Sequence, residues 1–364
     1  MLVAMLVGVV AAGCAKFSIV DEELIPVSFT TYNQRTDTKA GASYVAPGGD
    51  FAVGSIVSVY GYYHDNSTWA AETTAGNNIA DFMYNTALTK QSDGSWTYSP
   101  IKYWPNEYGT GANSDNVDKL SFWGYYPRGA AGLNLYKSGT STAYDNDTNG
   151  LPEVAFTQEE DPADQVDLMF TAPLRDLYKN DASHHGYVSG GEVTLVFKHA
   201  LSLVEFQLAE GTGAKLNTLT LTHIKKSGKV ADPGTIPLVW SNVGSEYTIS
   251  QNNLDVHEAT ILRLLAIPQD INALAEFTLN YDITFASSDP THPDPIVYTG
   301  DSFSVRLYDN TNADPSKRYG VTQWEAGKHY IYKIAAGLDR IEFEEVIEST
   351  DDWSVGNNNI SVPE

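Results

Sequence analysis

The chain has 364 residues, with 22 basic and 46 acidic side chains and a formal net charge of −24. So acidic a surface repels phosphate backbones, which argues against a nucleic-acid partner. The apolar and aromatic fractions, 42% and 12%, exclude a disordered acidic chain and indicate real hydrophobic cores.

The first fourteen residues have the pattern of a secretory signal. Leu2 to Val10 is an almost wholly apolar run, too short to cross a bilayer as a helix. Small residues then lead into Cys14, the only cysteine, so no internal disulfide can form. Small residues before a lone cysteine resemble a lipobox, at which the thiol is acylated and the chain is cut. We expect residues 1–14 to be a lipoprotein-type signal; a truncated signal with an incidental cysteine is the alternative. No Lys or Arg precedes the apolar run, which is compatible with an upstream start codon.

Residues 15–50 are mostly polar. Two segments in them have strand character, Phe17 to Val20 and Ile25 to Phe29, and each has the length of one strand. We expect one of them to form an edge or inserted strand in the precursor. Arg35 follows, and Lys16 and Lys39 are the only other basic residues before position 90.

From Phe51 onward, short runs of β-branched and aromatic residues alternate with Gly, Asn and Asp clusters, which is typical of an all-β sandwich. No helical period of useful length appears in this half. A long polar region covers residues 128–165, and residues 174–191 are expected to be an exposed connection. The first sandwich is therefore assigned to residues 51–188. Its expected strands are residues 53–62, 80–89, 96–98, 101–104, 120–126, 153–156 and 167–171.

Residues 189–364 form a second β-rich half that ends in a polar tail. Two sandwiches in series are the simplest architecture for this length and spacing. No apolar run after the signal approaches the length of a membrane-spanning helix. The expected strands are residues 193–197, 203–208, 216–223, 247–249, 259–267, 275–285, 296–298, 302–307, 329–335 and 341–347.

An ordered set of segments resembles the fimbrillin-like proteins of Bacteroidetes, the structural and accessory subunits of type V pili. The resemblance covers nearly the whole chain, and it rests on the order of the segments and not on a single motif. The segments are Ile101-Lys-Tyr-Trp-Pro105, Lys119-Leu-Ser-Phe-Trp-Gly-Tyr-Tyr-Pro127, Asp167-Leu-Met-Phe-Thr-Ala-Pro173, Val193-Thr-Leu-Val-Phe-Lys-His-Ala-Leu-Ser-Leu-Val-Glu-Phe206, Ala266-Ile-Pro-Gln269, Glu325-Ala-Gly-Lys-His-Tyr-Ile-Tyr-Lys333 and Asp351-Asp-Trp353.

The resemblance implies two transthyretin-like β-sandwich domains in tandem and a lipoprotein precursor held at the outer membrane through Cys14. It also implies proteolysis after a basic residue, for which Arg35 is the matching position. Removal of the N-terminal segment would open a groove that a strand from a neighbouring pilus subunit fills. The C-terminal segment is the candidate donor, through Ile341, Phe343, Ile347, Ile360 and Val362. Residues 341–347 could equally be the last strand of the second sandwich.

Residues that could carry chemistry are few. His184-His185 lacks a third ligand nearby, and His199 fits a packing motif. Asp145 to Gly150 opens like a calcium loop, but Phe156 stands where the bidentate Glu belongs, so a surface turn is favoured. The acidic cluster of residues 159–167 is expected to be a solvated connection. We therefore predict no enzyme, no cofactor and no metal site.

Aromatic residues crowd the first half, and they could fill a core or form a surface for host glycan or protein. Two functions from different classes remain. The first is a stalk or tip subunit of a type V-like pilus that assembles by strand exchange at the cell surface. The second is a surface lipoprotein, a pilus anchor or a glycan-binding module, that does not polymerise. The aromatics are Tyr60, Tyr62, Tyr63, Trp69, Tyr98, Tyr103, Trp104, Tyr108, Trp123, Tyr125 and Tyr126.

Overall fold

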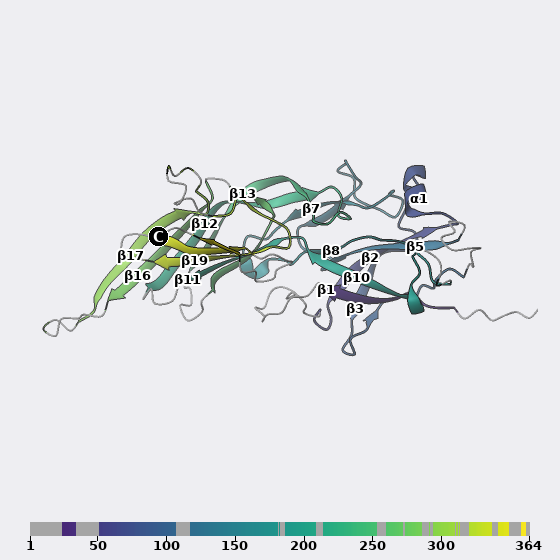
Figure 1. Ribbon diagram of the computed structural model, residues 1–364, viewed down its shortest axis with the longest axis horizontal. Helices are drawn as coiled ribbons and strands as arrows, with labels where there is room; N and C mark the ends of the chain where they lie inside the picture. Colours follow the sequence, from purple (N-terminus) through teal and green to yellow (C-terminus); the bar gives the residue numbers. More distant parts are fainter. Residues whose placement is uncertain are drawn as a thin grey trace, which may run out of the picture.

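The computed structural model confirms the all-β prediction and places every sheet within a limited set of described residues. These are residues 24–33, 51–106, 117–180, 182, 186–208, 214–252, 260–271, 274–285, 291, 294–309, 311, 313, 320–336, 341–348 and 358–361. Figure 1 shows an elongated molecule with the first sheet toward one end and the second toward the other, while the third sheet reaches from the second sheet's end to β7 beside the first sheet.

The first sheet is built mainly from the first half of the chain, in the order β1-β10-β8-β5-β2-β3-β4, with β9 also paired to β5. β1 runs parallel to β10, and the other pairs are antiparallel. The strands are β1 (Ser28–Asn33), β2 (Ile56–His64), β3 (Met83–Lys90), β4 (Trp96–Thr97), β5 (Lys119–Tyr126), β8 (Met169–Thr171), β9 (Leu174–Leu177) and β10 (Glu192–His199).

The second and third sheets face each other at the other end of the molecule. The second has the order β14-β11-β19-β20-β21, and its strands are β11 (Ser202–Leu208), β14 (Thr260–Ala266), β19 (His329–Ala336), β20 (Ile341–Glu348) and β21 (Asn358–Ser361). The third has the order β17-β16-β12-β7-β6, with β13 also paired to β12. Its strands are β6 (Leu133–Tyr136), β7 (Glu153–Thr157), β12 (Ala214–Val230), β13 (Trp240–Asn252), β16 (Glu276–Phe285) and β17 (Ile296–Arg306). A short ladder joins β15 (Gln269–Asp270) to β18 (Gln323–Trp324).

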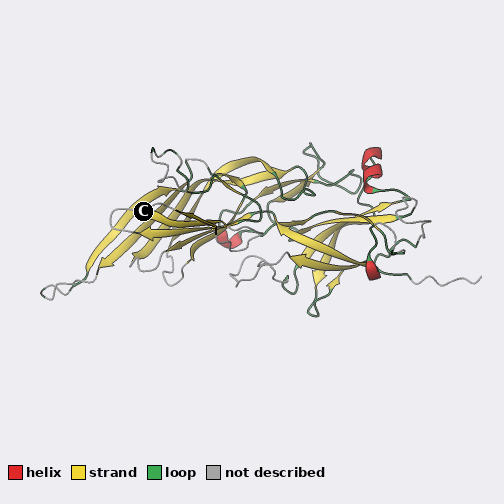
Figure 2. Ribbon diagram, viewed as in Figure 1, coloured by secondary structure: helices red, strands yellow, loops and turns green. Residues whose placement is uncertain are grey.

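Helices are few and short, as Figure 2 shows. The first half of the sequence shows no helical period of useful length, and one short α-helix, α1 (Trp69–Ala75), lies there. Thr68 caps its start by accepting a hydrogen bond from the Ala71 N–H, and Gly76 ends it in a left-handed conformation with φ of 80°. Seven residues are too few to show a helical period in the sequence. The 3-10 turns are η1 (Pro162–Asp164) and η2 (Ser189–Gly191).

Strands from both sides of residue 188 cross between the two ends of the molecule. β10 follows residue 188 but belongs to the first sheet, whereas β6 and β7 precede it and join the third sheet. β12 carries this crossing, because its first part pairs with β16 and its last four residues pair with β7. The division of the chain at residue 188 stays a prediction.

Three clusters of buried residues make the core. One lies between the second and third sheets, where the ring of Phe206 stacks on Phe277 and Tyr332 at 4.7 and 5.0 Å. A second cluster lies in the middle of the molecule and includes Trp123, Phe170 and Leu265. The third lies on the other face of the first sheet and includes Phe29, Phe51, Trp96, Phe122 and Phe197. This third core positions the candidate site.

Candidate assembly groove under β1

β1 is the outermost strand of the first sheet, and the segment from Ile25 to Phe29, which leads into it, seats alternate side chains in the third core cluster. Its backbone is in register with β10 from Ser28 opposite Glu192 to Asn33 opposite Phe197. Val27 and Phe29 are 1% and 4% exposed, and Ile25 packs against the same cluster, while Leu24 and Pro26 face solvent. This alternation is that of a strand with one buried face.

A second partner lies on the other side of the segment that leads into β1. The Val27 N–H donates to the Lys102 carbonyl at 2.9 Å, and the Trp104 N–H donates to the Ile25 carbonyl, also at 2.9 Å. The Tyr98 hydroxyl donates to the Val27 carbonyl at 2.7 Å. Burial raises the pKa of Tyr98, so this hydroxyl stays protonated and able to donate at neutral pH. Residues 25–33 are therefore held by residues 98–104 along Ile25–Val27 and by β10 along Ser28–Asn33.

Apolar and aromatic side chains line the seat of β1. The Phe29 ring packs edge-on against Tyr98 at 5.6 Å and against Phe122 at 5.3 Å between ring centroids. The Trp104 indole N–H donates to the Gly191 carbonyl at 2.8 Å, which fixes the floor beside Ile25. We call the seat formed by β10, residues 96–104 and Phe122 the β1 groove. Without β1, the groove would present an apolar trough beside unpaired backbone groups of β10, which is what an added strand recognises.

The expected N-terminal strand is partly confirmed by this arrangement. The sequence placed a strand at Ile25 to Phe29, and the structure places β1 at Ser28–Asn33 on the edge of the sheet. Phe17 to Val20, Cys14 and Arg35 lie outside the described residues, so lipidation and cleavage stay predictions. β1 ends two positions before Arg35, and the described chain resumes at Phe51. The Phe51 ring packs on Trp96, Tyr126 and Phe197 at 5.5, 4.9 and 5.3 Å.

The described candidate donor residues lie in the second sheet, in the other half of the molecule. β20 pairs with β19 on one side and β21 on the other, with Ile341 opposite Ala336, Phe343 opposite Ile334 and Ile347 opposite Ile331. Ile360 lies on β21 opposite Val346, and Val362 is outside the described residues. In this form of the chain, residues 341–348 are thus a strand of the second sheet. Their role as donors stays a prediction.

The residues considered for chemistry have structural partners. His199 Nδ1 lies 2.9 Å from Asp167 Oδ1, and both side chains are buried. The Asp145 carboxylate accepts from the Thr148 hydroxyl at 2.6 Å and pairs with Lys137 Nζ at 2.9 Å, as expected of a turn. His184-His185 lies outside the described residues. Among those described, no cluster of three His, Cys, Asp or Glu side chains is placed to hold a metal ion.

Most of the aromatic residues of the first half fill cores. Tyr60, Tyr62, Trp69, Trp104, Trp123 and Tyr125 are buried, and Tyr62 and Tyr144 join their hydroxyls at 2.9 Å. Tyr103 is 45% exposed, and Tyr108 lies outside the described residues. The aromatic residues thus supply packing more than a binding surface. Sequence reasoning did not single out Trp96, Tyr98 or Trp104 as groove residues, because only the approach of residues 96–104 to β1 reveals that role.

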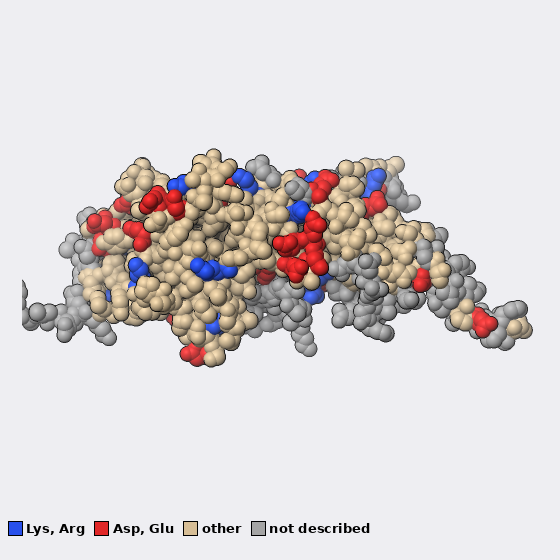
Figure 3. Space-filling view, turned by 180° about the vertical axis from the view of Figure 1, so that it is seen from behind, with Lys and Arg blue, Asp and Glu red and all other residues tan. Residues whose placement is uncertain are grey.

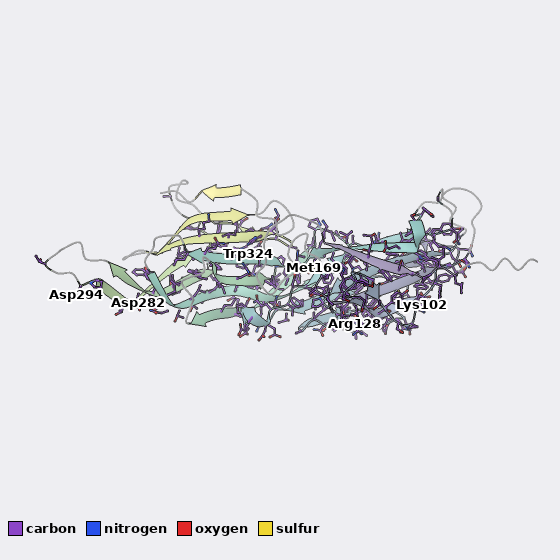
Figure 4. The ribbon with its side chains drawn as sticks, turned by 90° about the horizontal axis from the view of Figure 1, so that it is seen from below. Lys102, Arg128, Met169, Asp282, Asp294 and Trp324 are labelled. Atoms are coloured by element: carbon purple, nitrogen blue, oxygen red, sulfur yellow. The ribbon has the colours of Figure 1, made fainter. Side chains whose placement is uncertain are left out.

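The surface is mixed in charge, and acidic side chains gather near the middle of the face in Figure 3. Within the described part of the chain, no helix has both the length and the hydropathy that crossing a membrane requires. Figure 4 places Lys102, a groove residue, at the end of the molecule opposite to Asp294. The groove and the C-terminal strands β20 and β21 lie in different halves of the molecule along its long axis.

Comparison with known proteins places these features in context. Residues 38–353 match a family model described as Fimbrillin-like. No curated protein matches the chain. A solved structure of a candidate cell adhesion protein from Bacteroides uniformis is 15% identical, with a TM-score of 0.50, and the match covers 92% of this chain and 99% of that one. This likeness concerns the fold.

Two further solved structures are more distant. A candidate cell adhesion protein from Bacteroides ovatus is 16% identical, with a TM-score of 0.48, over 92% of this chain and 99% of that one. The C-terminally truncated tip fimbrial protein Mfa3 from Porphyromonas gingivalis is 13% identical, with a TM-score of 0.39, over 83% of this chain and 95% of that one.

Proposed function

The chain belongs to the fimbrillin-like family, and we propose that it is a stalk or tip subunit of a type V-like pilus that assembles by exchanging β1 for a strand of a neighbouring subunit. The observation that carries this proposal is the seat of β1. The edge segment of residues 25–33, which includes β1, buries Val27 and Phe29, ends two positions before Arg35, and is held mainly by contacts that another strand could reproduce.

The proposed sequence of events starts with a precursor anchored in the outer membrane by lipid at Cys14. Proteolysis after Arg35 then separates residues 15–35 from the rest of the chain. Cleavage by itself leaves β1 seated by its contacts, and burial of Val27 and Phe29 contributes roughly 1.5–3 kcal/mol each. Once the covalent link is cut, the effective concentration that it provided is lost, so a strand tethered to a neighbour can compete for the groove.

Packing beside the groove does not depend on β1. Phe51 is packed among Trp96, Tyr126 and Phe197, so the new N-terminal segment stays attached beside the groove. The incoming strand must place apolar side chains at alternate positions, and Ile341, Phe343 and Ile347 offer that spacing within β20. Such a subunit acts structurally, with other pilus subunits as its partners and the pilus at the cell surface as its location.

A second function is favoured by the number of hydrogen bonds that hold β1 and the segment leading into it. Hydrogen bonds reach the segment from β10 on one side and from residues 98–104 on the other. A protein that keeps β1 permanently would remain a lipid-anchored surface protein, such as a pilus anchor or a ligand-binding lipoprotein, and would not polymerise.

N-terminal sequencing of the protein recovered from the cell surface separates the two functions. The pilus proposal expects a chain that begins at Thr36 and migrates as polymers. The variant Arg35→Ala should accumulate as a longer, membrane-bound species without polymers, whereas the matched control Lys39→Ala should be processed normally. Retention of Cys14 and its lipid in wild-type cells would reject the stalk or tip role and favour the anchor.

A further inference from the structure

β14 is the outermost described strand of the second sheet, on the side away from β21. The backbone N–H and carbonyl of one of its residues, Leu265, face away from the sheet. Leu203 of β11 stands opposite Leu265 of β14, and the Leu203 N–H donates to the Lys328 carbonyl on the β19 side, at 2.9 Å. Leu203 and Leu265 are therefore a non-hydrogen-bonded pair, so the Leu265 N–H and carbonyl face away from the sheet. An edge of this kind is a template for another strand.

Two buried glutamines bind the outward-facing N–H and carbonyl of Leu265. Gln165 Oε1 accepts from the Leu265 N–H at 2.7 Å, and Gln158 Nε2 donates to the Leu265 carbonyl at 3.1 Å. Gln158 and Gln165 are 2% and 5% exposed. Their amides thus present to Leu265 the acceptor and the donor that the backbone of an added strand would present.

The loop that carries both glutamines, residues 158–166, is closed on itself. Gln158 Oε1 accepts from the Val166 N–H at 3.0 Å, and Gln158 Nε2 donates to the Val166 carbonyl at 3.1 Å. Gln165 Nε2 donates to the Glu159 carbonyl at 3.1 Å. Asp161 caps the η1 turn inside the loop by accepting from the Ala163 N–H at 2.9 Å. The position of the amides is therefore fixed by the loop, and leaving Leu265 would break several bonds at once.

Carboxylates cover the outer side of the same loop. Glu159, Glu160, Asp161 and Asp164 are exposed. A second copy of a chain with net charge −24 would approach this edge against repulsion. Charge on an edge is a known means of preventing strand addition.

The same chemistry recurs at a gap in β12. Pairing of β12 with β16 ends at Thr222, and pairing with β7 begins at Ser227. Between them, Gln269 Oε1 accepts from the Lys225 N–H at 2.8 Å and Gln269 Nε2 donates to the Lys225 carbonyl at 3.1 Å. Glutamine amides thus take the place of a neighbouring strand at two positions, Leu265 of β14 and Lys225 of β12.

We propose that the 158–166 loop blocks the β14 edge against strand addition by a second copy of this chain, so that this edge does not compete with the β1 groove. The inference rests on the proposed function in one respect, namely that copies associate by adding strands. Gln158 and Gln165 act as blocking residues. The acidic side chains of the loop add repulsion that salt weakens.

The test uses the full chain with Arg35→Ala, in which β1 stays attached. Gln158→Met and Gln165→Met together keep the side-chain volume but remove the amides, and Gln323→Met, at an exposed glutamine, is the matched control. Hydrogen exchange of residues 260–266 and light scattering over a range of protein and salt concentrations are measured. At low protein concentration, we expect hydrogen exchange of residues 260–266 to be at least tenfold faster in the double variant than in the Arg35→Ala parent. As the protein and salt concentrations rise, the double variant should form dimers, and dimer formation should restore the protection of residues 260–266.

Three outcomes would overturn the proposal: unchanged exchange, faster exchange in a chain that stays monomeric, or association that leaves residues 260–266 unprotected. If the double variant does not fold, Gln165→Met alone gives the same readout, because it leaves the closure of the loop by Gln158 intact. The result is independent of processing. Failure of the wild-type chain to polymerise after cleavage would reject the proposed function and leave this measurement interpretable.

Discussion

Trp96 and Thr31 join the two ends of one sheet, because the Trp96 indole N–H donates to the Thr31 hydroxyl oxygen at 3.1 Å. Thr31 lies on β1, the first strand in the order of the first sheet, and Trp96 lies on β4, the last. The sheet therefore curls around the cluster that contains Phe29 and Trp96, and β1 closes the curl. A strand at such a seam can leave without disturbing the pairing of the strands between.

A double-mutant cycle measures how much this hydrogen bond holds β1. We expect Trp96→Phe and Thr31→Val to destabilise the chain non-additively, with a coupling free energy of about 1 kcal/mol, the usual net contribution of one hydrogen bond. Urea unfolding of the wild type, both single variants and the double variant gives the coupling. Additive effects would show that the contact does not stabilise the seam.

Removal of the Phe29 ring should loosen β1 most strongly. Phe29→Ala empties the space between Tyr98 and Phe122. Core Phe→Ala changes typically lower the free energy of unfolding by roughly 3–5 kcal/mol. After limited trypsin digestion, the N-terminal fragment should dissociate from the variant faster than from the wild type, as measured by size-exclusion chromatography and mass spectrometry. Ser28→Ala, at an exposed position of β1, is the control and should release the fragment at the wild-type rate.

Stability at acid pH should depend on Glu205. Burial by itself would raise the pKa of this carboxyl, but hydrogen bonding and charge from His329 and Arg263 outweigh burial and hold the pKa at about 2, below its ordinary value of 4.5. A carboxyl whose pKa is lowered by folding stabilises the native state above its unfolded pKa, and this contribution is lost as the pH falls toward the folded pKa. Over that window the loss is at most about 3 kcal/mol.

The variant Glu205→Gln tests this dependence. Its free energy of unfolding should fall less steeply than that of the wild type between pH 4.5 and pH 2, as measured by urea titration at each pH. Glu246→Gln removes a carboxylate of an exposed pair with Lys225 and should leave the slope close to wild type. Equal slopes for Glu205→Gln and wild type would contradict the prediction.

Deletion of residues 351–364 tests the donor role of the C-terminus. Because β21 is the outer strand of the second sheet, the truncated chain should still fold, with β20 paired to β19. If the tail donates, the truncated protein should be processed at Arg35 but absent from polymers, as seen by electrophoresis without heating. Normal polymers from the truncated chain would remove residues 351–364 from the mechanism.

Sequence patterns located most strands but not all of their lengths. The expected strands at residues 120–126, 153–156, 203–208 and 329–335 are confirmed to within two residues by β5, β7, β11 and β19. β6 and β9 were not predicted, because four-residue strands with half-buried side chains show no clear alternation. β17 runs unbroken from Ile296 to Arg306, where the sequence predicted two strands at residues 296–298 and 302–307. Residues 101–104 make only an isolated bridge between Tyr103 and Pro26.

By itself, the sequence determined the all-β class, the family resemblance and an N-terminal strand ahead of a basic residue, because alternation, turn residues and the order of motifs are local properties of the chain. Only the tertiary structure decided which strands meet. The pairing of β1 with β10, the contact of Trp96 with Thr31, and the glutamines that cover Leu265 join residues 65 to 164 positions apart. Such contacts depend on how the sheets curl and cross, because one local pattern suits many partners until the core selects one.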